Sequence, residues 1–160
     1  MSKLTFAIQM EIDGEQYYLS QAEINKETSL YRAFLLLAEA EKKHADLLKK
    51  KYFATDNSIN VDLLTTEPNL FSGKADYMRD ADVVPGQLEV YGVALEMEQK
   101  SIDLYQGMLA ETSDEPTSQL IKFLIKQEQD HYTFFDELII LLRKPRDWVE
   151  DAEFGPRKEN

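Results

Sequence analysis

An internal repeat is the feature that most constrains what this chain can fold into. Four residues of the first half return 87 positions later as the same residue types. The four pairs are Glu11 with Glu98, Tyr18 with Tyr105, Glu41 with Glu128, and His44 with His131. The chain has only two histidines, and each follows a glutamate by three residues. A duplicated unit that supplies four carboxylates and two imidazoles predicts a site for two metal ions.

Four stretches of the sequence have the periodicity of amphipathic helices. They run from about residue 4 to 22, from 30 to 51, from 87 to 110, and from the start signal at 112–116 to about 143. Thr28 or Ser29 is the candidate N-cap of the second stretch. Glu41 and His44 lie within its apolar stripe, and their repeat mates lie within that of the fourth. Residues three apart share one helix face, so each pair is expected to face the core together.

The lengths of the connections predict how these helices are arranged. Short links join the first helix to the second and the third to the fourth, which favours two antiparallel hairpins. The link between the hairpins, about residues 53–85, is long enough to be a crossover that returns the chain to the opposite end of a bundle. The prediction is an all-α, ferritin-like four-helix bundle over residues 1–145. The tail, residues 146–160, is expected to pack apolar groups such as Trp148 on the bundle.

The acidic residues within the apolar stripes indicate a cation site. Four buried carboxylates are costly without partners, and two divalent cations would balance their charge. Carboxylate oxygens with one imidazole per ion suit iron, and manganese remains possible. Six ligands shared by two ions leave positions open for peroxide, oxygen or water, so the predicted metal ligands are also the predicted catalytic residues. These residues are Glu11, Glu41, His44, Glu98, Glu128 and His131.

Two tyrosines are candidates for a supporting role at this site. Tyr18 and Tyr105 follow Glu11 and Glu98 by seven residues, which is about two helical turns along the same face. Each hydroxyl is therefore expected to donate a hydrogen bond to a carboxylate of the site without binding the metal itself. The alternative is that both tyrosines are ordinary core residues.

The composition narrows the function further. The chain has 30 acidic and 18 basic residues and a net charge of -12, which disfavours nucleic acid and anionic membranes as partners. It has no cysteine, which excludes a cysteine-held iron–sulfur cluster, and no haem is expected. The N-terminus lacks the apolar core of a signal peptide, and no apolar run has transmembrane length. A cytoplasmic protein is therefore expected.

On these residues, the segment 4–143 resembles the rubrerythrin-like branch of the ferritin-like superfamily. The six predicted ligands and the two tyrosines carry the resemblance. It implies a four-helix bundle with a di-iron site. It also implies that the protein either reduces peroxide or oxidises ferrous iron. The assembled form that it implies is a homodimer.

The chain departs from the rubrerythrin pattern in two ways. Rubrerythrins with a rubredoxin domain carry a cysteine-bound iron that feeds electrons to the di-iron site. This chain has no cysteine, so a peroxidase cycle would need an external electron donor protein. Those rubrerythrins also have a further glutamate one turn after the ligand of the third helix. Here that position is Ser101, and its repeat mate is Gly14. A ligand exchange through that glutamate is therefore not expected.

Three functions are consistent with the sequence. The first is a redox enzyme, of the kind used against oxidative stress, that reduces hydrogen peroxide or oxygen at the di-iron site with electrons from an external donor. The second is a ferroxidase or iron-binding protein of iron homeostasis, which the acidic composition and Ser101 favour. The third is a non-catalytic helical bundle that the metal merely stabilises.

Overall fold

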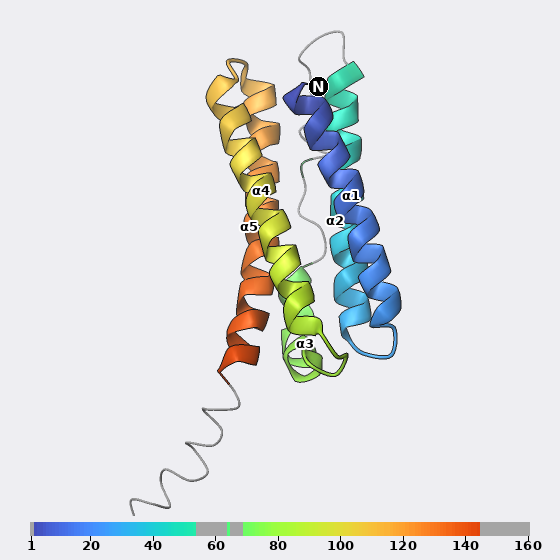
Figure 1. Ribbon diagram of the computed structural model, residues 1–160. Helices are drawn as coiled ribbons and strands as arrows, with labels where there is room; N and C mark the ends of the chain where they lie inside the picture. The colour runs from blue at the N-terminus through green and yellow to red at the C-terminus, as the bar shows by residue number, and fades with distance from the viewer. Residues whose placement is uncertain (1, 54–63, 65–68, 145–160) are drawn as a thin grey trace, which may run out of the picture.

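Four long helices form the bundle in the computed structural model, which describes residues 2–53, 64 and 69–144 (Figure 1). They are α1 (Lys3–Ile24), α2 (Leu30–Phe53), α4 (Gln87–Glu111) and α5 (Glu115–Arg143). A 3-10 turn, η2 (Leu70–Gly73), and a short helix, α3 (Lys74–Asp80), precede α4. The described residues contain no strand. The all-α prediction is therefore confirmed, and the long helices end within a few residues of the positions expected from the sequence.

The helices pair as two antiparallel hairpins that lie side by side (Figure 1). Helices α1 and α2 form one hairpin, α4 and α5 form the other, and most contacts between helices lie within a hairpin. Helix α2 ends at one end of the bundle, whereas α3 lies at the other end (Figure 1). Between α2 and α3 the chain thus passes from one end of the bundle to the other, as in a ferritin-like bundle.

Two apolar clusters fill the core, and they come from opposite ends of the bundle. One contains stacked aromatic rings, with the ring centroids of Tyr18 and Phe135 5.8 Å apart and those of Phe34 and Phe135 6.3 Å apart. The other contains Leu48, Leu124 and their neighbours. Large rings with few rotatable bonds hold their neighbours in defined positions. The helix segments between the two clusters carry the six predicted ligands, so those side chains are anchored on both sides.

The start of α2 is capped partly by the crossover. Thr28 Oγ1 accepts a hydrogen bond from the backbone N–H of Leu30 at 3.1 Å, as one of the two N-cap candidates would. The backbone N–H of Ser29 instead donates to Asp80 Oδ2, at 2.9 Å, from the end of α3. The sequence did not predict α3, because this helix is short. It also did not predict the contact of Asp80 with Ser29, because the two residues are 51 positions apart along the chain. This contact fixes the end of the crossover against α2.

Removing this distant cap is expected to destabilise the bundle. The variant Asp80→Ala should lower the free energy of unfolding by about 1 kcal/mol, because an N-terminal helix N–H loses its acceptor. Urea denaturation followed by circular dichroism measures the change. Asp82→Ala is the matched control, since Asp82 is exposed and makes no cap. Equal stability of the two variants would contradict the role assigned to Asp80.

Two sequence expectations lie at or beyond the limits of the described residues. The packing of Trp148, Val149 and Phe154 on the bundle concerns residues outside that part of the chain. The boundary of the bundle domain near residue 145 falls at its edge. Within the described residues, no helix combines the length and the apolar character that crossing a membrane requires.

Candidate metal centre

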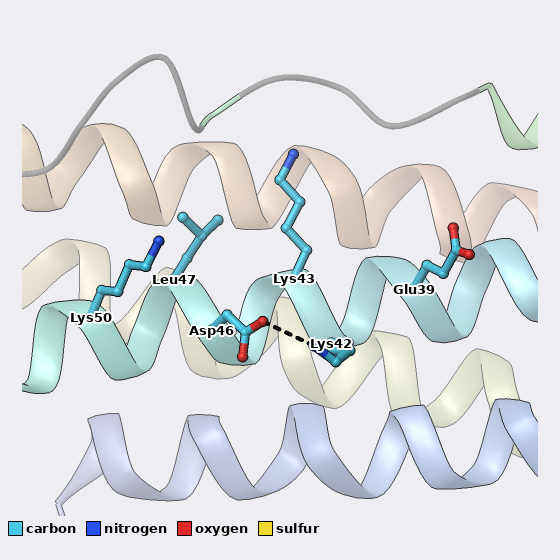
Figure 2. A pocket seen from close by; sticks show the side chains of 6 residues that line it. All are labelled: Glu39, Lys42, Lys43, Asp46, Leu47 and Lys50. Carbon is cyan, nitrogen blue, oxygen red and sulfur yellow. Dashed lines mark hydrogen bonds and ion pairs between the residues drawn. The ribbon is translucent and has the colours of Figure 1, made fainter.

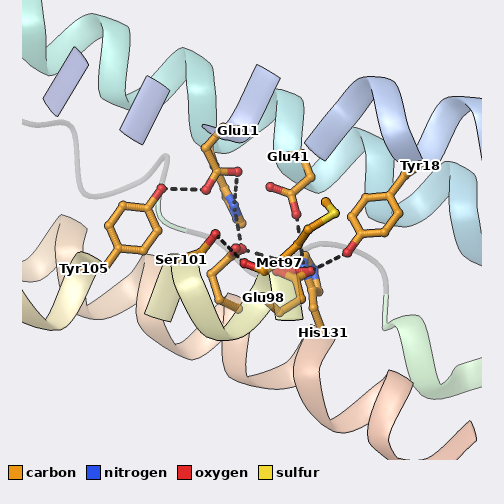
Figure 3. Close-up of polar contacts among 10 residues, drawn as sticks. Glu11, Tyr18, Glu41, Met97, Glu98, Ser101, Tyr105 and His131 are labelled. Carbon is orange, nitrogen blue, oxygen red and sulfur yellow. Dashed lines mark hydrogen bonds and ion pairs between the residues drawn. The ribbon is translucent and has the colours of Figure 1, made fainter. Parts of the chain in front are cut away.

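The six predicted ligands lie together in the interior of the bundle. Figure 3 shows four of them, Glu11, Glu41, Glu98 and His131, pointing toward one another. All four long helices contribute to this cluster, and each of the six residues is at most 5% exposed. Helix α1 supplies Glu11, α2 supplies Glu41 and His44, α4 supplies Glu98, and α5 supplies Glu128 and His131. Each Glu-x-x-His pair points inward from one helix, as its three-residue spacing predicts.

The cluster consists of two overlapping groups of four residues. Glu11 and His44 belong to the first group, and Glu98 and His131 belong to the second. Glu41 and Glu128 belong to both. Within each group, one ligand atom from every residue lies within 4.8 Å of the others. The arrangement could therefore hold two ions, each with one histidine and one carboxylate of its own. Two shared carboxylates would lie between the ions.

The Nδ1 atoms of both histidines face the carboxylates. His44 Nδ1 lies 3.3 Å from Glu11 Oε2, and His131 Nδ1 lies 3.1 Å from Glu98 Oε2. His44 Nδ1 is also 3.1 Å from Glu128 Oε1. His44 Nε2, on the other side of the ring, has no hydrogen-bond partner among the described residues. Nδ1 is thus the ring atom available to a metal ion.

Two buried tyrosines join the hairpins through the outer carboxylates (Figure 3). The hydroxyl of Tyr18, on α1, donates to Glu98 Oε2 on α4 at 2.7 Å. The hydroxyl of Tyr105, on α4, donates to Glu11 Oε1 on α1 at 2.5 Å. Burial and the nearby carboxylates raise the pKa of both phenols well above the usual value, so both remain protonated donors. Their hydrogen bonds fix the orientation of the outer carboxylates.

Without cations, the tyrosine hydroxyls serve the outer carboxylates of Glu11 and Glu98, but Glu41 and Glu128 lack such donors and favour the protonated form. Among the described residues, neither buried oxygen of Glu128 has a hydrogen-bond partner, although His44 Nδ1 lies 3.1 Å from its Oε1. Burial, reinforced by neighbouring carboxylates, raises the pKa of Glu41 and of Glu128 well above the usual value. Burial acts to lower the pKa of His44, but the neighbouring carboxylates of Glu11 and Glu128 together outweigh burial and raise that pKa to about 10. These residues fit two divalent cations, which would replace the protons.

The structure adds a cavity that the sequence did not predict. It has a volume of about 360 Å³, lies between α1 and α4, and reaches Glu41 and Glu98. Gly14 and Ser101 line it. In the sequence, these two residues stood out only because neither of them is a seventh carboxylate.

A second cavity, of about 290 Å³, lies on the outer face of α2 and contains none of the six ligands (Figure 2). It is bordered by charged side chains, including the Lys42–Asp46 ion pair at 3.4 Å.

Fold and site together define a ferritin-like four-helix-bundle protein with a buried carboxylate and histidine cluster that could hold metal. The model of the rubrerythrin family matches residues 3–139. The chain therefore belongs to the rubrerythrin family, and this family implies a di-iron centre. Since the chain has no cysteine, it contains no cysteine-held iron of the rubredoxin type. No match was found among curated proteins or among solved structures.

Removing either tyrosine hydroxyl is expected to weaken the junction between the hairpins. Tyr18→Phe and Tyr105→Phe should each lower the free energy of unfolding by about 1.5–3 kcal/mol, the range for hydrogen bonds to charged groups. Both should also weaken metal binding. The control is Tyr91→Phe, which removes a buried hydrogen bond to the backbone oxygen of Ala81. It should cost stability without changing metal affinity, and equal metal affinities in all three variants would contradict the role of Tyr18 and Tyr105.

Proposed function

We propose that the protein is a di-iron redox enzyme that reduces hydrogen peroxide or oxygen with electrons from an external donor protein. The observation that carries this proposal is the pair of overlapping groups that share Glu41 and Glu128. A purely structural metal site is usually closed by protein ligands. Here six side chains would serve two ions, and a cavity reaches the carboxylates of the second group.

The residues of the chain have distinct tasks in this proposal. When bound, two ferrous ions supply one electron each, and a peroxide that takes up both, with two protons from solvent, leaves as two water molecules. Glu41 and Glu128 would each serve both ions, and the histidines would bind them as neutral ligands. Tyr18 and Tyr105 keep the outer carboxylates in place. The aromatic cluster beside Tyr18 keeps water away from that side of the site.

The proposal also specifies the metal, the electron donor, the assembly and the partners of the enzyme. We infer iron rather than manganese from the family, and a separate donor from the lack of cysteine. A cytoplasmic homodimer is proposed, with no nucleic acid or membrane as partner. The net charge of -12 supports the exclusion of these polyanionic partners.

A ferroxidase is the second candidate, and Ser101 favours it. A glutamate at this position would be a seventh carboxylate beside Glu98, and the chain places a small hydroxyl residue there instead. The hydroxyl of Ser101 donates to the backbone oxygen of Met97 at 3.2 Å. It is therefore engaged within its own helix. Reaction with oxygen during ferrous loading would then be the main activity.

One experiment separates these functions. Metal content is measured in protein purified without added metal, and the protein is then loaded anaerobically with ferrous iron and mixed with peroxide or with oxygen in a stopped-flow instrument. About two irons per chain, oxidised much faster by peroxide than by oxygen, is the result expected for the proposed enzyme. Faster oxidation by oxygen would assign a ferroxidase. Metal that stabilises the fold without reacting faster than free iron would leave the non-catalytic bundle.

A further inference from the structure

The cavity between α1 and α4 leads from the surface to the metal site. Its mouth carries the exposed Asp13 and Lys100, which are repeat mates with opposite charges. The half-buried Met10 and Met97, also repeat mates, form its walls, and Figure 3 shows Met97 beside the carboxylates. At its deep end lies Glu41, a carboxylate shared by both ligand groups. Exposure thus falls steadily from the mouth to the site.

Two small residues keep this cavity open. A Cβ atom added at Gly14 would lie 3.3 Å from Cδ of Glu41, which is tighter than an ordinary contact. On the facing helix, Ser101 is only 8% exposed and bonds to its own backbone. A larger side chain at position 101 would occupy the space beside Glu98. Ser101, where the chain departs from the seven-carboxylate pattern, and its repeat mate Gly14 therefore both leave space in this cavity.

The size and lining of the cavity fit a molecule larger than hydrogen peroxide. Its volume of about 360 Å³ falls in the range of pockets for small organic ligands, about 300–1,000 Å³. A water molecule occupies only about 30 Å³ of liquid, and hydrogen peroxide is larger than water by a single oxygen atom. The thioethers of Met10 and Met97 and the ring of Tyr17 offer an apolar wall. Apart from Asp13 and Lys100 at the mouth, the charged groups of the lining are the candidate metal ligands Glu41 and Glu98 at the deep end.

We propose that this cavity binds the organic part of an alkyl or aryl hydroperoxide and presents its O–O bond to the metal site. This inference rests on the peroxide-reducing function proposed above and names its substrate class. Two ferrous ions give one electron each, the O–O bond breaks, and two protons come from solvent. The products are one alcohol and one water molecule, and the external donor then restores the two electrons. Met10, Met97 and Tyr17 contact the organic group, and Gly14 and Ser101 leave room for it.

The first test compares two oxidants on the iron-loaded protein. Ferrous protein is mixed with cumene hydroperoxide or with hydrogen peroxide, and the ratio of the two oxidation rates is measured. Ser101→Leu should lower this ratio by about 10-fold or more, because the added side chain takes up space that the larger oxidant needs. Ser20→Leu is the matched control, since Ser20 is exposed on α1 outside the cavity, and it should leave the ratio unchanged. An unchanged ratio in Ser101→Leu would overturn the inference.

A second measurement does not depend on turnover. The protein is loaded with zinc, which is diamagnetic and has no redox chemistry, and its methionine methyl groups are labelled with carbon-13. The stable alcohol 2-phenyl-2-propanol, the product from cumene hydroperoxide, should shift the methyl signals of Met10 and Met97. These shifts should disappear in Ser101→Leu and remain in Ser20→Leu. Absence of shifts at both methionines in the parent protein would overturn the inference.

The outcomes distinguish this inference from the function on which it rests. If hydrogen peroxide oxidises the ferrous protein rapidly and cumene hydroperoxide does not, the cavity proposal is wrong and the proposed function stands. If neither oxidant reacts faster than with free iron, the proposed function is wrong, and the substrate assignment is lost with it. Should Ser101→Leu fail to fold, Met97→Phe fills the cavity from its wall and is judged by the same ratio.

Discussion

Replacing Glu41 or Glu128 by glutamine is expected to abolish the binding of two metal ions while leaving the metal-free bundle folded. Each of these carboxylates belongs to both ligand groups, so its loss affects both ions. Loss of ligand-orienting neighbours alone costs about 10–100-fold in metal affinity, and loss of a shared ligand should exceed that range. In the metal-free protein the raised pKa of both residues keeps them protonated, and glutamine has nearly the same shape and no charge.

Calorimetric titration with ferrous iron under anaerobic conditions and thermal melting measure this effect. At a free metal concentration of 100 times Kd, one bound ion should stabilise the parent fold by about 2.7 kcal/mol. The glutamine variants should lose most of that gain and keep the melting temperature of the metal-free parent. Glu39→Gln is the control, because Glu39 lies on the same helix and is exposed. If Glu41→Gln still bound two ions with unchanged affinity, the proposal that Glu41 serves both ions would be refuted.

The metal-free protein is expected to lose stability as the pH rises from about 6.5 towards 10. The pKa of His44 is about 10 in the folded protein and 6.5 in its ordinary state, so the folded state binds more protons over this range. The stabilisation from His44 is therefore complete below pH 6.5 and is lost as the pH rises through the folded value. The raised pKa values of Glu41 and Glu128 act in the same direction from pH 4.5 upward. Burial acts to raise the pKa of Glu11, but His44 and hydrogen bonds from Glu41 and Tyr105 together lower it, so Glu11 is ionised in both states and adds nothing over this range.

Metal binding should remove this dependence, because cations displace the protons. The melting temperature of the metal-free protein should fall between pH 6.5 and 9, whereas that of the loaded protein should change much less. Binding should release the protons that Glu41, Glu128 and His44 hold in the metal-free protein. Calorimetry in buffers with different ionisation enthalpies counts them, and metal affinity should increase with pH. Binding without proton release would show that the cluster is already ionised.

Much of the bundle could be predicted because its pattern is local and repeated. Two Glu-x-x-His pairs within apolar stripes fix which helix faces are buried, and the 87-residue offset shows that two like hairpins are present. Short links then leave few ways to pair the helices. The convergence of six polar side chains follows from these facts alone. Their role as metal ligands remains a prediction that titration must test.

The features that the sequence did not show depend on contacts between distant segments. The cap that Asp80 provides for α2 joins residues 51 positions apart, and no local signal marks it. Helical spacing places the tyrosines on the correct face, but which carboxylate each one reaches depends on how the hairpins dock. The cavity arises from the absence of bulk at Gly14 and Ser101. Small residues occur throughout helices, so their presence alone does not indicate a cavity.

The exchange of hydrogen bonds between the hairpins has a consequence for how the protein opens. Tyr18 reaches across to Glu98 and Tyr105 reaches back to Glu11, while most other helix contacts remain within a hairpin. Each hairpin thus supplies the tyrosine that holds a carboxylate of the other hairpin, as the two subunits of a symmetric dimer do. The interface between the two hairpins is therefore the weakest contact between helices in the bundle, and it contains the candidate metal site. On heating the metal-free protein, the two hairpins should therefore separate from each other before either one melts, and bound iron should hold them together.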